Sequence, residues 1–211
     1  MFTIQNDVLS VTVNEVGAEL SSIFHKQHQQ EYLWSADPAF WAKKSPVLFP
    51  IVGTLKKNSY NFEGKLYQLS RHGFAREKVF TVSGQSENAI SFSITEDAHT
   101  LENYPFRFVF KITYSLQSDQ LSVEYDVANT GDIPMYFSVG GHPAFRVPLT
   151  QESSYTDYYL EFRAEETAGR WPSISNGTKL HYYQIAARTG LKNNLLLLIT
   201  TLLRSIGPAI W

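Results

Sequence analysis

The clearest indication of the fold lies at residues 106–127, which read FRFVFKITYSLQSDQLSVEYDV. Apolar and polar residues alternate from Phe106 to Leu116 and again from Leu121 to Val127. Alternation with a period of two is typical of a strand that is buried on one face. The polar residues 117–120 between the two runs indicate a turn. This stretch therefore predicts two paired strands joined by a short connection.

The same pattern continues outward in both directions along the chain. Further strands are predicted at Leu9–Val13, Val79–Val82, Ile90–Ile94, Met135–Val139 and Tyr158–Phe162. Residues 60–67 are expected to form a hairpin with Gly64 in its turn, and residues 83–86 to form a polar loop. Asp37 and Pro38 suggest one helical turn. Short strands separated by turn signals predict an all-β sandwich or barrel.

The composition excludes several classes of protein. Among 211 residues, 43% are hydrophobic and 18% are charged, a charged share below the usual quarter, which argues against intrinsic disorder. Cysteine is absent, so disulfides, thiolate nucleophiles and cysteine-ligated metals are excluded. The net charge of −2 provides no basic field for nucleic acid or an anionic membrane. The first residues contain no basic segment of a signal peptide, so we expect a cytoplasmic protein.

The last forty residues differ from the rest. None of the 20 acidic residues follows Glu166. Residues 195–203 are almost continuously Leu, Ile and Thr, about half the length needed to span a bilayer. We expect a short buried or adhesive segment here rather than a membrane helix.

Two histidines stand out because each lies beside glycine at the end of a predicted strand. His72 lies in residues 71–76, RHGFAR, and His142 in residues 138–145, SVGGHPAF. Gly73 allows a close backbone approach, and Pro143 keeps His142 extended. Two interpretations remain open: a functional pair, or loop histidines that bond backbone carbonyls. By contrast, the polar surroundings of His25 and His28 favour a solvated loop over a metal site.

Several segments together resemble the aldose 1-epimerase (galactose mutarotase-like) family, and in particular its small bacterial branch. They are residues 41–53 (WAKKSPVLFPIVG), the hairpin at 60–69, RHGFAR at 71–76 and GHPAF at 141–145, with NDVLSV at 6–11 and GAEL at 17–20. The aromatic content of 14% suits a well-filled sandwich core and also sugar binding.

The resemblance implies a large antiparallel β-sandwich with an open sugar cleft, incomplete at the C-terminus. It also implies interconversion of the α and β anomers of an aldose, with no cofactor and no metal. By this resemblance His142 protonates the ring oxygen and His72 contacts the sugar near the same atom. We expect Arg71, Arg76, Phe74 and Phe145 to contribute further substrate contacts. The two arginines leave open a phosphorylated hexose.

The sequence departs from the family near its C-terminus. The family's base is a glutamate in a Glu-Pro-Trp-like motif, and a sugar-binding aspartate precedes it, but nothing acidic follows Glu166 here. We therefore expect residues 1–170 to form a partial epimerase-like sandwich and residues 171–211 to be a frameshifted or otherwise atypical tail. Weak or absent mutarotation is expected. The alternatives are a non-catalytic carbohydrate-binding sandwich, a truncated product without function and, remotely, a cupin-like metal enzyme.

Overall fold

The computed structural model describes residues 1–158, 167–170, 183–186 and 198–206. They divide into two compact units, one of Met1–Arg146 with Leu197–Trp211 and one of Val147–Leu196. In the second unit, β13 (Thr167–Arg170) pairs antiparallel with β14 (Tyr183–Ala186), and η3 (Tyr155–Asp157) is a single 3₁₀ turn. Every site residue discussed below belongs to the first unit.

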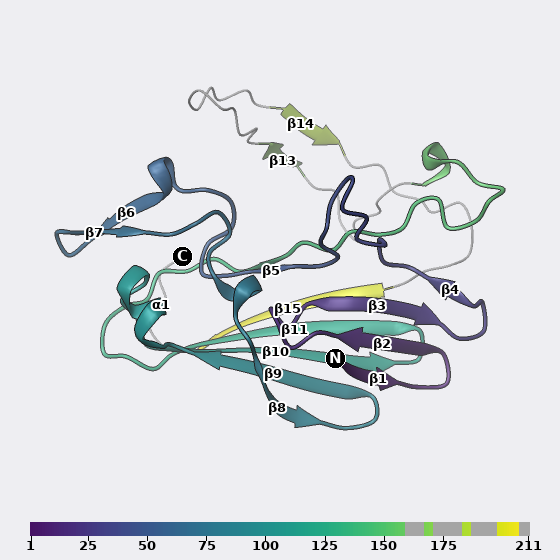
Figure 1. Cartoon of the computed structure of the whole chain (residues 1–211), viewed down its shortest axis with the longest axis horizontal. Helices are drawn as coiled ribbons and strands as arrows, with labels where there is room; N and C mark the ends of the chain where they lie inside the picture. Colours follow the sequence, from purple (N-terminus) through teal and green to yellow (C-terminus); the bar gives the residue numbers. More distant parts are fainter. Residues whose placement is uncertain (159–166, 171–182, 187–197, 207–211) are drawn as a thin grey trace. The chain divides into compact units, whose positions relative to one another are not determined.

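The first unit contains a four-stranded antiparallel sheet in the order β1-β2-β3-β4 (Figure 1). Its strands are β1 (Phe2–Gln5), β2 (Leu9–Val13), β3 (Leu20–His25) and β4 (Gln30–Glu31). Leu9, Val11 and Val13 are fully buried while the residues between them are partly exposed. The alternation predicted for this strand is therefore confirmed.

The second sheet of the unit has the order β15-β11-β10-β9-β8. Its strands are β8 (Thr81–Gln85), β9 (Ala89–Thr95), β10 (Phe108–Gln117), β11 (Gln120–Asn129) and β15 (Leu198–Ile206). β10 and β11 pair along their whole length, from Phe108 opposite Asn129 to Gln117 opposite Gln120. This ladder is the hairpin that residues 106–127 predict. β15 pairs with β11 in parallel, whereas the other neighbours in both sheets are antiparallel.

Aromatic side chains join the two sheets into a sandwich. The rings of Phe2 in β1 and Phe92 in β9 lie 5.6 Å apart in an edge-to-face arrangement. Tyr114 of β10 is fully buried and its hydroxyl donates to the carbonyl of Ala18 at 2.8 Å. Each large apolar side chain so buried stabilises the fold by roughly 1.5–3 kcal/mol. The expected antiparallel β-sandwich is confirmed, and it forms the base on which the loops with the candidate site rest.

Shorter elements lie outside the two sheets. β5 (Val47–Leu48) pairs with β12 (Gly140–Gly141), and β6 (Ser59–Phe62) pairs with β7 (Lys65–Gln68) in the predicted hairpin. Gly64 takes a φ of +79° in that turn, as glycine readily does. The helical elements are η1 (Lys56–Asn58), η2 (Ala75–Glu77) and α1 (Ala98–Asn103). The Asp37 turn is also confirmed, because its side chain accepts from the Ala39 N–H and its carbonyl from Phe40 and Trp41.

Other local predictions are wrong. No regular strand forms at Met135–Val139, and the predicted loop at 83–86 is largely strand β8, with a register shift between Val82 and Gly84. Helix α1 was not expected, although Asp97 and Thr100 form a capping box at its start. His25 is buried at the end of β3 rather than solvated. Most of Tyr158–Phe162 lies outside the described residues.

The described residues contain no helix that is both long and apolar enough to cross a membrane.

Candidate active site

The backbone of His142 is held by a neighbouring extended segment. Gly141, just before it, pairs with Val47, and the His142 N–H donates to the Pro46 carbonyl at 3.1 Å. A side chain at position 141 would place its Cβ 2.8 Å from the hydroxyl oxygen of Tyr125. Glycine at position 141 leaves room for this hydroxyl, and the chain enters His142 in an extended conformation, as Pro143 also favours.

The residues after His142 are held from two directions. The Ala144 N–H donates to the Lys44 carbonyl at 2.8 Å, while the Trp34 N–H donates to the Ala144 carbonyl at 2.9 Å. Phe145 then forms an antiparallel bridge with Leu33. The segment that follows His142 is thus fixed by backbone bonds, although Phe145 itself keeps 37% of its surface exposed.

His72 is fixed through two hydrogen bonds with Gly53. The His72 N–H donates to the Gly53 carbonyl at 2.8 Å, and the Gly53 N–H donates to Nδ1 of the imidazole at 3.0 Å. His72 takes a φ of +69°, which is uncommon for a residue other than glycine. Gly73 follows at φ +69° and packs directly on the backbone of Phe49. The loop is therefore closely built, and the ring of His72 has one orientation.

The bond from Gly53 also sets the tautomer of His72. A backbone N–H can only donate, so Nδ1 must carry a lone pair and a neutral ring holds its proton on Nε2. The Nε of Arg71 also lies 3.0 Å from that Nε2, with its N–H directed at the ring. A neutral imidazole accepts on one nitrogen only, so these two bonds compete. Since Arg71 is exposed, its side chain is the partner that can move away.

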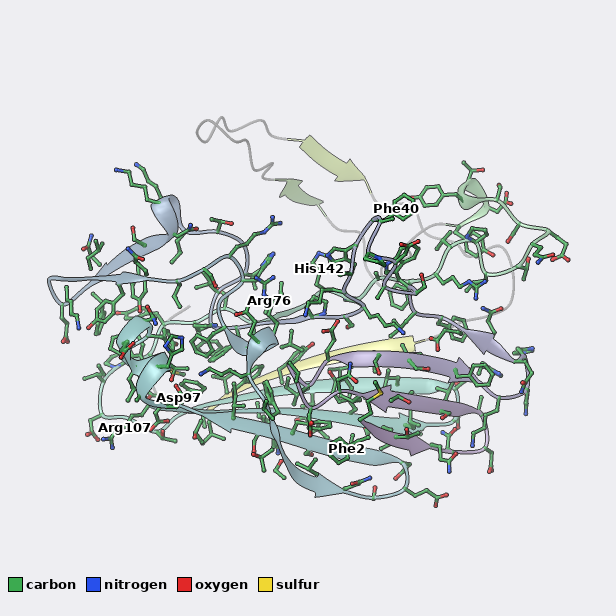
Figure 2. All side chains as sticks on the ribbon, in the orientation of Figure 1. Phe2, Phe40, Arg76, Asp97, Arg107 and His142 are labelled. Atoms are coloured by element: carbon green, nitrogen blue, oxygen red, sulfur yellow. The ribbon has the colours of Figure 1, made fainter. Side chains whose placement is uncertain are left out.

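The two histidines meet although they are seventy residues apart in the sequence. Their ring centroids lie 6.5 Å apart with the planes at 73°. The indole of Trp41 lies 4.9 Å from the ring of His142, so Trp41 forms one wall of the pair. Figure 2 labels His142 and Arg76 in the loops on one side of the sheets. The rings of His72 and His142 are therefore close enough to contact the same small molecule.

The surroundings of His72 disfavour its protonated form. Burial lowers its pKa below the ordinary value of 6.5, and the positive charges of Arg71 and Arg76 and the ring of His142 lower it further. His72 therefore becomes protonated at a lower pH than a free histidine does. A neutral ring with hydrogen on Nε2 is a hydrogen-bond donor to an oxygen atom.

The other predicted contact residues are distributed unevenly. Arg71 lies at the His72 ring, whereas Arg76 is partly buried and its Nε lies 3.6 Å from a carboxylate oxygen of Glu77. Phe74 packs among aromatic core residues, with its ring centroid about 6 Å from those of Phe49, Tyr104 and Phe108. These are packing contacts, but Phe74 is only partly buried, so a contact with substrate stays a prediction.

Two residues of the arrangement were missed from the sequence. Trp41 and Gly53 begin and end the segment 41–53 that carries part of the family resemblance, yet neither was assigned to the site. Trp41 contacts His142 and Gly53 orients His72. The only indication in the sequence is that this segment belongs to the family resemblance together with the two histidine motifs. Nothing in its composition indicates which histidine each end approaches.

Two further features bound the chemistry of this region. Within the described part of the chain, no group of three or more His, Cys, Asp or Glu side chains could hold a metal ion. A cavity of about 590 Å³ lies beside the β6–β7 hairpin and is lined mainly by aromatic and aliphatic side chains, among them Tyr60, Phe62 and Tyr136. Neither His72 nor His142 lines that cavity, so it is distinct from the histidine pair.

Comparison with known proteins identifies the family of this chain. The family model described as aldose 1-epimerase matches residues 1–177. Protein LacX, chromosomal, of Lactococcus lactis subsp. lactis is 36% identical over 170 residues, which are 78% of this chain and 56% of that protein. This chain thus spans little more than half the length of the relative.

Two solved structures are similar. A galactose mutarotase related enzyme from Lactobacillus acidophilus is 36% identical with a TM-score of 0.79, over 84% of this chain and 59% of the other. A galactose mutarotase-like protein from Lactobacillus casei ATCC 334 is 37% identical with a TM-score of 0.76, over 83% and 60%. The family match over most of the chain and the sandwich shared with these relatives lead to one conclusion: this chain belongs to the aldose 1-epimerase family.

Proposed function

We propose that the histidine pair binds an aldose and acts on its ring oxygen, with His142 as the general acid and His72 as a hydrogen-bond donor to the same region of the sugar. The observation that carries this proposal is the 6.5 Å separation of the two ring centroids. Trp41 adds an aromatic surface beside His142, and aromatic faces suit the C–H face of a pyranose.

The chemistry of mutarotation explains why such a pair is useful. The C1 hydroxyl loses a proton while the ring oxygen gains one, so the C1–O5 bond opens to an aldehyde. Rotation about C1–C2 and closure on the other face give the second anomer. A histidine can supply the proton to the ring oxygen near neutral pH. His72, with its proton on Nε2, can donate a hydrogen bond to the same oxygen without changing its own protonation.

The base is the missing part of the proposed site. In the family it is a glutamate near the C-terminus, and no acidic residue follows Glu166 in this sequence. Loss of one proton-transfer group costs roughly 10²–10⁴-fold in rate. We therefore propose that the 211-residue chain binds the sugar but catalyses mutarotation weakly or not at all.

Polarimetry together with tryptophan fluorescence tests this. Freshly dissolved α-glucose or α-galactose should equilibrate at close to the uncatalysed rate, while a saturable fluorescence change reports binding near Trp41. His142→Ala should weaken binding, and His99→Ala, an exposed histidine paired with Glu102, is the matched control. A normal turnover abolished by His142→Ala would refute the proposed inactivity and establish His142 as catalytic. Absence of any binding would refute the proposal as a whole.

A non-catalytic carbohydrate-binding sandwich is the alternative, and the missing base favours it over a full enzyme. It predicts saturable binding without faster anomer exchange, and only a modest effect of His142→Ala. The two proposals therefore differ in how strongly the affinity depends on His142.

The charge beside His72 favours a phosphorylated hexose as the substrate. The pKa of His72 is lowered first by burial and then by the positive charges of Arg71 and Arg76, and no acidic neighbour offsets them by raising it. An anionic substituent would neutralise this field and give the exposed Arg71 a bidentate partner. Hexose 6-phosphate should then bind more tightly than the free hexose, and Arg71→Gln should remove that difference. Equal affinities for the two sugars would exclude the phosphate.

We further propose that residues 1–170 are the part that follows the family and that residues 171–211 are an atypical tail. The absence of acidic residues after Glu166 supports this division. Reading the gene in its neighbouring frames is the test, and the proposal fails if no frame restores an acidic continuation with a Glu-Pro-Trp-like motif. Size-exclusion chromatography with and without the tail would identify a non-functional, self-associating product.

A further inference from the structure

The carboxylate of Glu19, which lies outside the histidine pair, accepts hydrogen bonds from the segment that is bonded to the backbone of His142. Glu19 is buried, with 7% of its surface exposed. Its Oε1 accepts hydrogen bonds from the backbone N–H groups of Lys44 and Ser45, at 2.9 and 3.0 Å. Its Oε2 lies 3.9 Å from Nζ of Lys43. Glu19 thus connects the beginning of β3 to a segment about 25 residues further along the chain.

The segment that Glu19 holds is the one that holds His142. The Lys44 carbonyl accepts from the Ala144 N–H at 2.8 Å, and the Pro46 carbonyl accepts from the His142 N–H at 3.1 Å. In residues 44–46, the N–H groups of Lys44 and Ser45 therefore donate to the Glu19 carboxylate, and the carbonyls of Lys44 and Pro46 accept from the His142 segment. No other described side-chain acceptor is bonded to the Lys44 or Ser45 N–H group.

We propose that Glu19 is a positioning residue for His142. Its buried carboxylate fixes residues 44–46, and these residues fix the backbone from which the His142 ring projects. Bonds to a charged acceptor are roughly twice as strong as neutral ones, so one carboxylate can make this segment rigid. This positioning role rests on the proposed function in one respect: that function makes His142 the residue whose position matters.

Glu31 illustrates why the effect is specific to Glu19. Its Oε1 also accepts two backbone N–H groups, those of Ile23 and Leu33, at 2.9 and 2.8 Å. Leu33 bridges Phe145, three residues beyond His142. Glu31 therefore supports the far end of the segment, whereas Glu19 supports the residues bonded to His142 itself.

Two conservative substitutions separate the hydrogen bonds from the charge. Glu19→Gln removes the charge but keeps an acceptor oxygen at the same reach. Glu19→Asp keeps the charge but withdraws the carboxylate by one methylene, so the bonds to Lys44 and Ser45 are lost. Glu96→Asp is the matched control, because Oε2 of Glu96 accepts the Phe108 N–H at 3.1 Å at the beginning of β10.

Amide hydrogen exchange and the NMR chemical shifts of the His142 ring are the measurements, made on the full chain. In Glu19→Asp the His142 and Ala144 amides should exchange about tenfold to a hundredfold faster, because charge-assisted bonds that anchored their partners are gone. The His142 ring signals should also change their chemical shifts. Glu19→Gln keeps an acceptor but loses the charge, so its exchange rates should fall between those of the wild type and Glu19→Asp. Glu96→Asp should accelerate exchange at Phe108 alone.

Two results would overturn the proposal. One is faster exchange at Lys44 and Ser45 in Glu19→Asp with unchanged exchange and unchanged ring chemical shifts at His142. The other is a Glu19→Asp protein in which the Lys44, Ser45 and His142 amides all exchange as in the wild type, which would mean that the carboxylate does not hold this segment. Neither measurement needs a sugar, so a wild-type chain that binds no aldose would refute the proposed function and leave the positioning role intact.

Discussion

Replacing Gly73 with alanine should destabilise the protein and displace His72, because no side chain fits at this position. A Cβ on Gly73 would lie 2.3 Å from the carbonyl oxygen of Phe49 and 2.6 Å from Cδ of Pro50. Contacts between such atoms are normally about 3.5 Å or more, so the two backbone segments would have to separate by roughly 1 Å. The φ of +69° adds a cost of its own.

The magnitude follows from two contributions. A Cβ in the left-handed region costs about 1–2 kcal/mol. Separation of the segments weakens the two bonds that the Phe49 carbonyl accepts from the Phe74 and Ala75 N–H groups, at 3.0 and 3.1 Å. Each is worth about 0.5–1.5 kcal/mol. The expected loss in the free energy of unfolding is therefore about 2–5 kcal/mol.

Gly64→Ala is the control for the conformational part of that loss. Gly64 has a similar φ of +79°, but a Cβ there would meet nothing within 4 Å. Only the cost of about 1–2 kcal/mol should remain. Urea unfolding followed by tryptophan fluorescence measures both variants. Equal losses for Gly73→Ala and Gly64→Ala would refute the reasoning, because the close approach to Phe49 would then carry no free energy.

Three other groups give measurable expectations. Burial and nearby cations lower the pKa of His72, so below pH 6.5 the folded protein binds fewer protons than the unfolded chain. The contribution of His72 to the free energy of unfolding is therefore fully present above pH 6.5 and is lost as the pH falls through the folded pKa. The same acid loss of stability in His72→Gln would contradict this. Tyr114→Phe should cost about 1–3 kcal/mol in urea unfolding by leaving the buried Ala18 carbonyl unpaired, and an unchanged midpoint would contradict it. Asp97→Ala should lower the free energy of unfolding by about 1 kcal/mol, because it removes the cap bond to the Thr100 N–H, and Asp97→Asn should lower it clearly less. Thermal unfolding measures both variants, and equal losses would argue against a capping role.

The parts of the fold that could be predicted are those with a strong local pattern. Residues 106–127 give the β10–β11 ladder because the alternation continues for eleven residues before the turn and seven after it. Gly64 marks its hairpin turn, and Asp37 caps its turn, since each feature depends on a few neighbouring residues. Local chemistry was sufficient in these places.

The parts that failed depend on tertiary contacts or on weak signals. Met135–Val139 alternates like a strand, yet the structure gives it no regular strand, and only Ser138 donates to the Pro50 carbonyl among the backbone bonds described there. Six residues are too short for helical periodicity to reveal α1, so its capping box was the only evidence. The meeting of His72 and His142 was expected from the family resemblance, but the role of Gly53 depends on a bond across 19 residues that no pattern encodes.

The hydrogen bond from Gly53 to the imidazole of His72 has a consequence for inhibitor chemistry. It leaves the free nitrogen of this ring with an N–H and no lone pair, in a region where the charges of Arg71 and Arg76 lower the pKa of the ring. An iminosugar carries a protonated nitrogen where a pyranose has its endocyclic oxygen, so it would present hydrogens and positive charge to a donor in a cationic neighbourhood. Compounds of this kind should be rejected here, and neutral oxygen-containing rings should be preferred.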